Sequence, residues 1–443
     1  MTFKDFNLNN PLWNALDDVS IKIPTSIQKK TFPVIMSGRD VTGIAQTGTG
    51  KTLAYLLPLL KMWAFNKSRH TSVLIIVPTR ELVVQVVDSA TMLSKYMNVV
   101  IRGVYGGTNL KTQAYELAEG CDILIGTPGR LLDLGYHGSL NLKNIRKLVI
   151  DEVDEMLSLG FRSQLQHIFD LLPEKRQNLM FSATMTDDVI RLIEEEFNNP
   201  ENIEAAPSGT PLDNIKQIAY RVPNFNTKIN LLHIILDQNP DMNKVLLFVS
   251  TKALADTLHT DLSARYEGKI GVIHSNKDQN FRFNAVNSFK DGTYTVLIAT
   301  DIIARGLDIE DVSHVINFDL PEQPESYIHR IGRTGRADRK GEAISLISDF
   351  ETDMLSSIEA LMEYTVPLQD KPENLEISDV LTEAEMPEIR MKNVLAPLPK
   401  MSDTGAFHEK KAKNQKVNIK VRYKDKMHAK YGKPKTRGQK RKK

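Results

Sequence analysis

Short runs of apolar, mostly β-branched residues alternate with amphipathic stretches along most of this chain, and this alternation is the strongest constraint on its fold. A run of four or five apolar residues fits a strand that is covered on both faces, as in a parallel sheet. The amphipathic stretches supply the helical crossovers that parallel strands need. We therefore predict an α/β fold with parallel sheets. The predicted strands are 41–44, 73–77, 122–125, 148–150, 178–181, 245–249, 270–273, 296–299, 314–317 and 343–347.

The predicted strands fall into two groups, which indicates two domains. Between the groups lies segment 198–214, which holds three prolines, has no apolar periodicity and is typical of an inter-domain linker. The 443 residues also exceed the ~100–200 residues of one ordinary domain. The predicted organisation is a first domain at 1–205, a linker at 206–211, a second domain at 212–365, an extension at 366–409 and a tail at 410–443.

Charge is distributed unevenly along the chain. The tail 410–443 holds 16 basic residues and one acidic residue, Asp425, whereas residues 1–409 hold 41 basic and 54 acidic residues. The tail has few apolar residues and its like charges repel, so we expect it to be disordered and to attract polyanions. Tyr423 and Tyr431 offer rings on which bases can stack. One interpretation is RNA or ribosome contact, and the other is a solubilising tail without a specific partner.

Cysteine content and the apolar stretches exclude several classes of protein. The single cysteine, Cys121, forms no internal disulfide and no cysteine-based zinc site, which favours a reducing compartment. The most apolar long stretch, 53–65, is interrupted by Pro58 and Lys61 and is shorter than the ~18 residues of a membrane helix. Residues 1–10 do not form a basic and then apolar signal segment. We expect a cytoplasmic protein without membrane contact.

A glycine-rich segment after the predicted strand 41–44 is typical of a phosphate-binding loop. Its sequence is Ala45-Gln46-Thr47-Gly48-Thr49-Gly50-Lys51-Thr52. In such loops, glycines let backbone N–H groups face phosphate oxygens, and the N-terminus of the following helix adds partial positive charge. Lys51 is expected to reach the β- and γ-phosphates, and the Thr52 hydroxyl to bind Mg²⁺. The segment predicts ATP or GTP binding, and Pro58 predicts a kink or an early end of the helix.

Three acidic residues follow the predicted strand 148–150, in the order Asp151-Glu152-Val153-Asp154. A carboxylate at the carboxyl end of a parallel strand, next to a phosphate-binding loop, is placed to hold Mg²⁺ through water. Its neighbour can accept a proton from the attacking water. We therefore predict Asp151 as the magnesium residue and Glu152 as the general base of a nucleotide hydrolase.

With these two segments in place, the sequence resembles the DEAD-box RNA helicases of superfamily 2 over about residues 3–347. Short motifs stand in the family's order across both predicted domains, and Val153 replaces the alanine of the family's name. The further motifs are Pro24-Thr25-Ser26-Ile27-Gln28, Pro78-Thr79-Arg80-Glu81-Leu82, Gly106-Gly107, Thr127-Pro128-Gly129-Arg130, Ser182-Ala183-Thr184, Ala299-Thr300-Asp301 with Ala304-Arg305-Gly306-Leu307-Asp308, and His329-Arg330-Ile331-Gly332-Arg333-Thr334-Gly335-Arg336.

The resemblance implies roles around ATP. Gln28 would pair with the N6 and N7 edge of adenine, Phe3 would stack on the adenine, and Asp308 would contact the ribose. Arg333 and Arg336 would reach the γ-phosphate as arginine fingers when the domains close. The implied nucleotide-binding residues are Phe3, Gln28, Thr47, Gly48, Thr49, Gly50, Lys51, Thr52 and Asp308, and the implied catalytic residues are Lys51, Asp151, Glu152, Arg333 and Arg336.

The resemblance also implies coupling and RNA-binding residues. Ser182 and Thr184 would couple ATP binding to strand separation, together with Asp154, His329 and Arg330. For Arg330, a salt bridge inside the cleft is an equal alternative, and for Thr127 and Thr300 the alternative is a helix cap. The implied RNA contacts reach the backbone, so recognition would not depend on sequence. The implied RNA-binding residues are Arg80, Gly107, Thr127, Arg130, Thr300 and Arg305.

The combined prediction is an ATP-dependent RNA helicase with two tandem RecA-like domains, which uses ATP and Mg²⁺ and acts as a monomer. It would separate short duplexes locally or remodel RNA–protein complexes. The main alternative is an ATP-gated RNA clamp or scaffold without productive unwinding, and a second is a DNA helicase of the same superfamily. The compact core and short tail look most like bacterial relatives of the cold-shock type. That likeness implies roles in ribosome assembly, mRNA turnover or cold adaptation, with ribosomal precursors or RNA-degradation machinery as partners.

Overall fold

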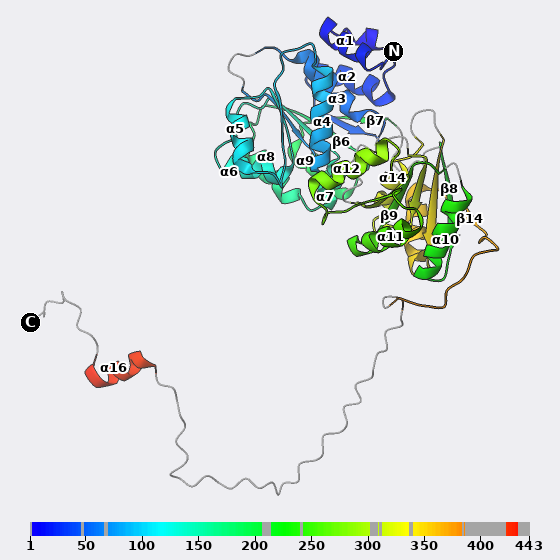
Figure 1. Cartoon of the computed structure of the whole chain (residues 1–443). Coiled ribbons are helices and arrows are strands. Elements are labelled where there is room, and N and C mark those ends of the chain that lie inside the picture. Colours follow the sequence, from blue (N-terminus) through cyan, green and yellow to red (C-terminus); the bar gives the residue numbers. More distant parts are fainter. Residues whose placement is uncertain are drawn as a thin grey trace, which may run out of the picture. The chain divides into compact units, whose positions relative to one another are not determined.

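The computed structural model of the chain describes residues 2–45, 48–65, 70–205, 214–239, 242–301, 309, 312–335, 340–382, 385 and 422–432. Its contacts divide the chain into two units, Met1–Met386 and Pro387–Lys443. The described part of the first unit contains two parallel sheets with helices around them (Figure 1). The α/β prediction with parallel sheets is therefore confirmed.

Each sheet has seven strands among the described residues, and all the recorded pairings are parallel. The first sheet has the spatial order β3 (Ile101–Val104), β4 (Ile123–Gly126), β2 (Val73–Ile76), β5 (Lys147–Asp151), β6 (Gln177–Ser182), β1 (Val41–Ile44) and β7 (Glu201–Glu204). The second has the order β10 (Ile270–Ile273), β11 (Val296–Thr300), β9 (Val245–Val249), β12 (His314–Asn317), β13 (Gly341–Ile347), β8 (Ile215–Arg221) and β14 (Leu368–Gln369).

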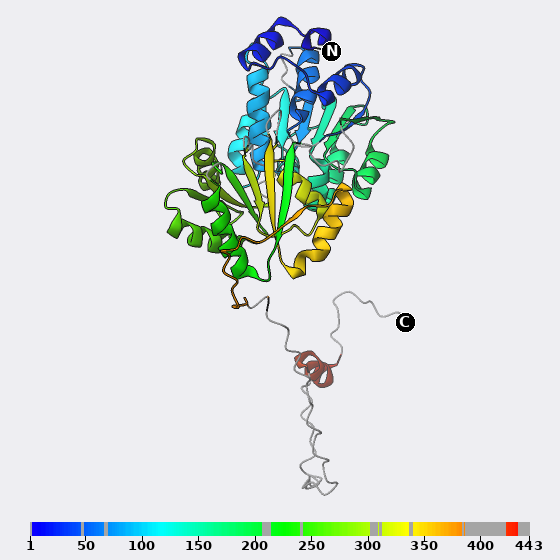
Figure 2. The ribbon, with the colours of Figure 1, turned by 90° about the vertical axis from the view of Figure 1, so that its right-hand side faces the viewer.

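Helices follow most strands and pack on the sheets, as two views at right angles show (Figures 1 and 2). Those of the first half are α1 (Asn10–Asp18), α2 (Ser26–Met36), α3 (Lys51–Met62), α4 (Arg80–Leu93), α5 (Leu110–Ala118), α6 (Pro128–Tyr136), α7 (Val153–Ser158), α8 (Arg162–Leu171) and α9 (Asp187–Glu196), with the 3-10 helix η1 (Phe3–Phe6). Those of the second half are α10 (Phe225–Gln238), α11 (Lys252–Arg265), α12 (Gln279–Lys290), α14 (Pro324–Ile331) and α15 (Thr352–Met362), with η2 (Asp349–Glu351).

The ten predicted strands are mostly buried on both faces, which explains their continuous apolar runs. In β2, Val73 and Ile75 pack into one apolar cluster, and Leu74 and Ile76 pack into another. Successive side chains of a strand point to opposite faces, so the two clusters lie on opposite sides of the first sheet. All ten predicted strands are present. The missed strands are β3, β7, β8 and β14, which are short, polar or interrupted by glycine.

One local prediction is wrong, and of the kink or early end predicted at Pro58 the early end does not occur. Segment 198–214 was expected to be linker, but β7 lies inside it and pairs with β1 at the edge of the first sheet. Residues 206–213, which include the predicted linker 206–211, lie outside the described residues. An early end at Pro58 does not occur, because α3 continues to Met62. Its neighbours in the helix are nearly all buried, and tertiary packing of this kind outweighs the propensity cost of one proline.

The chain after residue 365 is partly built into the second half. Strand β14 pairs with β8, and α10 holds the chain beyond it: Asn230 Nδ2 donates to the Glu376 carbonyl at 2.9 Å and Asn226 Nδ2 to the Val380 carbonyl at 2.7 Å. The beginning of the predicted extension is thus packed against the second half. The domain boundaries themselves stay predictions.

The tail is described only at residues 422–432, where it forms one short helix. Helix α16 (Tyr423–Tyr431) has no buried residue and is followed by Gly432 at φ 70°. Lysine, alanine and methionine favour helices, and Asp425 in the first turn suits the helix dipole.

Across the described ranges, no helix has the length and apolar character needed to cross a membrane.

Gly43 of β1 tests the packing of the apolar core of the first half. A Cβ added there would lie 2.6 Å from Phe181 Cδ1, so Gly43→Ala is expected to destabilise the first half by about 1–3 kcal/mol. Gly135→Ala is the matched control, because its Cβ would meet only Leu171 Cδ1 at an ordinary 3.5 Å. Thermal unfolding measures both variants. An unchanged midpoint for Gly43→Ala would contradict the packing of β1 against Phe181.

Candidate active site and RNA-binding surface

The glycine-rich loop joins β1 to α3 in the first half. Gly48 and Gly50 have φ of 81° and 85°, in the left-handed region that favours glycine. Lys51 is the first residue of α3 and is buried. Among the described residues, its Nζ atom has no hydrogen-bond partner. Gln46 and Thr47 lie outside the described residues, so the predicted role of Thr47 has no structural counterpart here.

Gln28 is brought directly against this loop. Its Oε1 accepts a hydrogen bond from Thr25 N at 3.0 Å, and its Nε2 donates to the Gly50 carbonyl at 3.1 Å. A Cβ on Gly50 would lie 2.4 Å from Gln28 Nε2, so only glycine fits there. The Gln28 amide therefore links the start of α2 to the phosphate loop, in addition to the adenine contact expected of it.

Phe3 lies in the apolar core of the first half. Its side chain is 1% exposed and packs edge-to-face on Phe6, with the ring centroids 5.4 Å apart. Phe6 in turn stacks on Phe32. Burial of large aromatic rings against one another is strongly favourable, so the Phe3 ring belongs to the apolar core in this structure. The stacking of Phe3 on adenine stays a prediction, and in this structure the ring packs on Phe6.

The acidic segment follows β5 and faces Lys51. Asp151 accepts hydrogen bonds from the Tyr55 hydroxyl and from Glu152 N, both at 3.0 Å. Burial raises the pKa of Asp151, against the opposing effect of the Lys51 charge. Glu152 has a φ of 53°, which is rare outside glycine, and such backbone strain clusters at functional sites. Burial raises the pKa of Glu152 to about 7, although Lys51 acts to lower it.

Asp154 connects the acidic segment to the end of β6. Its Oδ2 accepts hydrogen bonds from Ala183 N at 3.2 Å, Thr184 N at 3.0 Å and Thr184 Oγ1 at 2.9 Å. Ser182 Oγ donates to the Thr184 carbonyl at 2.7 Å. Burial acts to raise the pKa of Asp154, but the charges of His329 and Lys51 and these hydrogen bonds hold it below its ordinary value.

Residues from both halves line one pocket. Lys51, Glu152 and Asp154 come from the first half, and His329 and Arg333 come from the second. His329 Nε2 lies 3.7 Å from Asp154 Oδ2, and the Arg333 charge acts on Glu152. The structure thus brings the predicted catalytic residues Lys51, Asp151, Glu152 and Arg333 into one region. Arg336 and Asp308 lie outside the described residues.

Arg330 is held inside the second half. Its guanidinium is bidentate to Asp301, with Nε–Oδ1 at 2.5 Å and Nη2–Oδ2 at 2.7 Å, and the side chain is 1% exposed. It also lies over the Phe248 ring, 5.0 Å from the centroid. Of the two alternatives for Arg330, the salt bridge is therefore the one that this structure contains.

Two predicted RNA-binding residues of the first half touch each other. Arg80 begins α4, and its guanidinium covers Gly107, where a Cβ would lie 2.1 Å from Nη1. Gly107 also has a φ of 82°, so this position requires glycine. Thr127 stands at the N-cap of α6, as the alternative prediction has it. Its hydroxyl makes no capping hydrogen bond, so capping does not explain why a threonine stands there.

Arg130 is buried and hydrogen-bonded to the loop that follows β3. The residue is 7% exposed, and the guanidinium donates to Gln113 Oε1 at 2.6 Å and to the Thr108 carbonyl at 2.9 Å. Arg130 therefore holds the loop that carries Gly107, and its direct RNA contact stays a prediction.

In the second half, Thr300 ends β11 and lines a pocket to which Ser250, Lys252 and Ser275 contribute polar side chains. Thr300 is 8% exposed and precedes Asp301, the partner of Arg330. Arg305 lies outside the described residues.

An ion pair and a hydrogen bond join the two halves at residues that the sequence did not single out together. Arg282 Nη1 of α12 lies 2.8 Å from Glu81 Oε1 of α4, and Gln279 Nε2 donates to the same oxygen at 3.2 Å. Glu81 stands inside a motif that was noticed, but Gln279 and Arg282 lie in an ordinary polar segment. No signal in that segment pointed to a partner in the other half.

Two family models match the chain: DEAD/DEAH box helicase over residues 25–192, and Helicase conserved C-terminal domain over residues 227–338. Among curated relatives, the DEAD-box ATP-dependent RNA helicase CshA of Bacillus subtilis is 39% identical over 362 residues, which cover 81% of this chain and 72% of CshA. The ATP-dependent RNA helicase DbpA of the same organism is 37% identical over 378 residues, covering 85% of this chain and 78% of DbpA.

Solved structures agree with these matches. Saccharomyces cerevisiae Dbp5 bound to RNA and ADP BeF3 has a TM-score of 0.75 and 28% identity, with 83% of this chain and 95% of that chain covered. Mss116p bound to ssRNA and AMP-PNP has a TM-score of 0.76 and 26% identity, with 83% and 78% covered. Together with the two parallel sheets and the shared pocket, these matches show that the chain belongs to the DEAD-box ATP-dependent RNA helicases, which are RNA-dependent ATPases built from two RecA-like domains.

Proposed function

We propose that ATP is hydrolysed in the pocket lined by Lys51, Glu152 and Arg333, and that RNA binds along Arg80 and Gly107 of the first half and Thr300 of the second. The convergence of residues from both halves on one pocket carries this proposal. A site divided in this way is complete only when both halves meet, so nucleotide binding and the relative position of the halves are linked.

Lys51 supports nucleotide binding most directly. The carboxylates of Asp151, Glu152 and Asp154 act on its charge, but among the described residues no atom accepts a hydrogen bond from its ammonium, and nucleotide phosphates would supply acceptors. The Asp151 carboxylate and the Thr52 hydroxyl have the oxygen donors that Mg²⁺ prefers. When bound there, Mg²⁺ would neutralise charge on the phosphates. Gln28 then holds the loop in place, and Asp308 is proposed for the ribose.

Glu152 is proposed as the base that accepts the proton of the attacking water, because a pKa of about 7 is near the optimum for such a group. Arg333 and Arg336 are proposed to stabilise charge on the γ-phosphate. Asp154 touches both Thr184 and His329, so it is suited to transmit domain closure to the Ser182–Thr184 segment.

RNA binding is proposed to depend on backbone contacts. The Arg80 guanidinium, the Thr127 hydroxyl and the Thr300 hydroxyl suit phosphate and 2′-OH groups, which are the same for every sequence. Arg305 and the basic tail would add charge. The solved complexes of Dbp5 with RNA and ADP BeF3 and of Mss116p with ssRNA and AMP-PNP support this proposal by similarity.

We infer local separation of short duplexes, or remodelling of RNA–protein complexes, by a monomer. Ribosome assembly, mRNA turnover and cold adaptation are the proposed settings, by likeness to bacterial relatives. An RNA clamp without productive unwinding is the competing proposal. Strand displacement at a catalytic ratio of protein to duplex separates the two, because a clamp releases at most one strand per bound protein.

The Glu152→Gln variant tests the proposed general base. Loss of the base is expected to lower RNA-stimulated kcat at least about 100-fold while ATP and RNA still bind. Steady-state ATPase is measured without nucleic acid, with single-stranded RNA and with matched DNA. Equal stimulation of the wild-type enzyme by DNA, or no stimulation by either, would contradict the proposal.

A second prediction concerns Gly107→Ala, with Gly106→Ala as its control. The added Cβ at Gly107 would lie 2.1 Å from Arg80 Nη1, whereas at Gly106 the nearest atom is Arg80 Nη2 at 3.8 Å. We expect RNA binding about tenfold weaker for Gly107→Ala, with the salt slope reduced by about one phosphate contact. Binding titrations at several salt concentrations measure this. Equal affinity of both variants would contradict the role of Arg80.

The third prediction removes the tail 410–443. Its 16 basic residues are expected to contribute affinity by counterion release, so deletion weakens RNA binding and flattens its salt dependence. ATPase activity without RNA is expected to stay unchanged. A salt slope equal to that of the full chain would leave the solubilising interpretation.

A further inference from the structure

Lys228 of α10 is a buried lysine that the proposed mechanism does not use. Its side chain is 4% exposed, and its three donors are all satisfied. Nζ lies 2.7 Å from the Phe318 carbonyl, 2.6 Å from Glu351 Oε2 and 3.5 Å from Asp319 Oδ1. A buried charge is tolerated when it is paired and hydrogen-bonded in this way.

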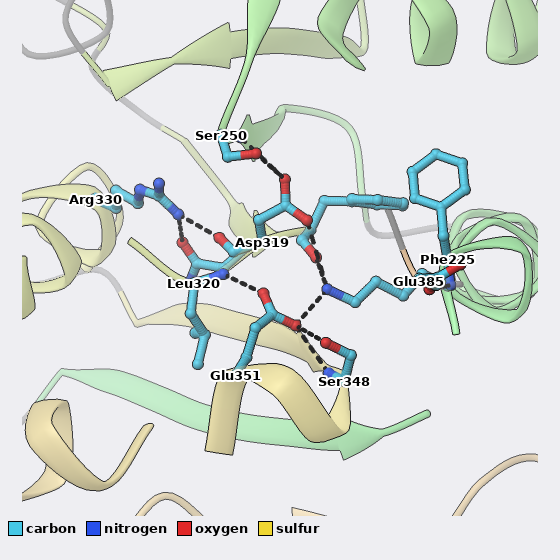
Figure 3. A network of polar contacts seen from close by, with 11 residues as sticks. Phe225, Ser250, Asp319, Leu320, Arg330, Ser348, Glu351 and Glu385 are labelled. Carbon is cyan, nitrogen blue, oxygen red and sulfur yellow. Dashed lines mark hydrogen bonds and ion pairs between the residues drawn. The ribbon is translucent and has the colours of Figure 1, made fainter. Parts of the chain in front are cut away.

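The partners of Lys228 hold one short turn. Glu351 Oε1 accepts a hydrogen bond from Leu320 N at 2.9 Å, and its Oε2 accepts bonds from Ser348 N and Oγ (Figure 3). Lys228 and Glu351 together therefore hold the turn 318–320, which follows β12, at its first and last residues.

This turn is connected to the proposed RNA-binding edge on two sides. Asp319 Oδ2 accepts bonds from Ser250 N at 3.0 Å and Ser250 Oγ at 2.7 Å, just after β9. The Asp319 carbonyl accepts a bond from Arg330 Nη1 at 2.6 Å, and Arg330 is bidentate to Asp301 (Figure 3). Strands β11, β9 and β12 are neighbours in the sheet, so the turn supports three adjacent strand ends.

We propose that Lys228 is a positioning residue for RNA binding: it fixes the turn 318–320, and the turn fixes Ser250 and, through Arg330, Asp301 beside Thr300. This inference rests on the proposal that Thr300 contacts RNA. Ser250, Thr300, Asp301 and Arg330 line the same pocket, whereas Lys228 and Glu351 do not. Lys228 thus acts on the pocket only through its partners.

The network also reaches the chain beyond the second sheet. Glu385 Oε1 accepts a hydrogen bond from Phe225 N, at the first residue of α10, at 2.6 Å (Figure 3). Asn224 Nδ2 donates to the Ser378 carbonyl at 2.5 Å. The N-terminal turn of α10 is therefore held from outside by this segment and anchored inside by Lys228.

The test compares full-length Lys228→Met with Lys216→Met. Lys216 also pairs with a glutamate of the second half, Glu342, at 3.1 Å, but its side chain is 67% exposed. We expect the KM for single-stranded RNA in the ATPase assay to rise about tenfold in Lys228→Met, since small displacements of binding groups are costly. The KM for ATP and kcat at saturating RNA are expected to stay within about twofold, and Lys216→Met is expected to resemble the wild type.

A second variant keeps the test decisive if Lys228→Met does not fold. Glu351→Gln keeps the side-chain shape but replaces one acceptor oxygen with an NH2 group, which weakens the contacts with Lys228 and with the turn, so a rise in the RNA KM is expected. An unchanged RNA KM in either folded variant, or a loss confined to kcat or to the ATP KM, overturns the positioning role. RNA stimulation of the wild-type ATPase is measured separately. If RNA does not stimulate the wild-type enzyme, the proposed function is wrong, and this inference is wrong with it.

Discussion

Parallel pairing of the strands is the constraint on which the rest of the structure depends. Because all strands of a sheet run in one direction, their carboxyl ends meet at one edge. In the first sheet, β5, β6 and β1 are neighbours: β5 ends at Asp151, β6 ends at Ser182, and β1 leads into the loop before Lys51. In the second sheet, the neighbours β11, β9 and β12 lead to Thr300, Ser250 and Asp319. Both candidate sites are therefore consequences of strand order.

Buried charged side chains join the two halves. Glu81 and Arg282 form an ion pair in which both side chains are nearly buried, and Asp154 meets His329 at 3.7 Å. Pairs of this kind contribute little net stability, because desolvation offsets most of the attraction, but leaving one partner unpaired is costly. They are suited to a contact that forms when the halves meet and breaks when they part. This chemistry fits an enzyme whose site is shared between two domains.

Several predicted residues support the site and are not exposed at it. Arg130 holds the loop of Gly107, Arg330 holds Asp301, and Phe3 lies in the apolar core. An arginine in a motif has the same chemistry whether it faces a ligand or a neighbouring carboxylate, so its surroundings decide its role. The motif segments indicated where the site lies, and the packing decided which side chains are exposed in it.

The sequence by itself determined the α/β class, ten of the strands and the segments that carry the chemistry, because apolar runs and glycine-rich loops are local patterns. Only the tertiary structure decided the four missed strands β3, β7, β8 and β14, the Glu81–Arg282 link and the Lys228 network. Strand β7 is polar and short, and becomes a strand by pairing with β1. The partners of Lys228 lie 90 and more residues away in the sequence, and no local pattern encodes which distant carboxylate a buried lysine meets.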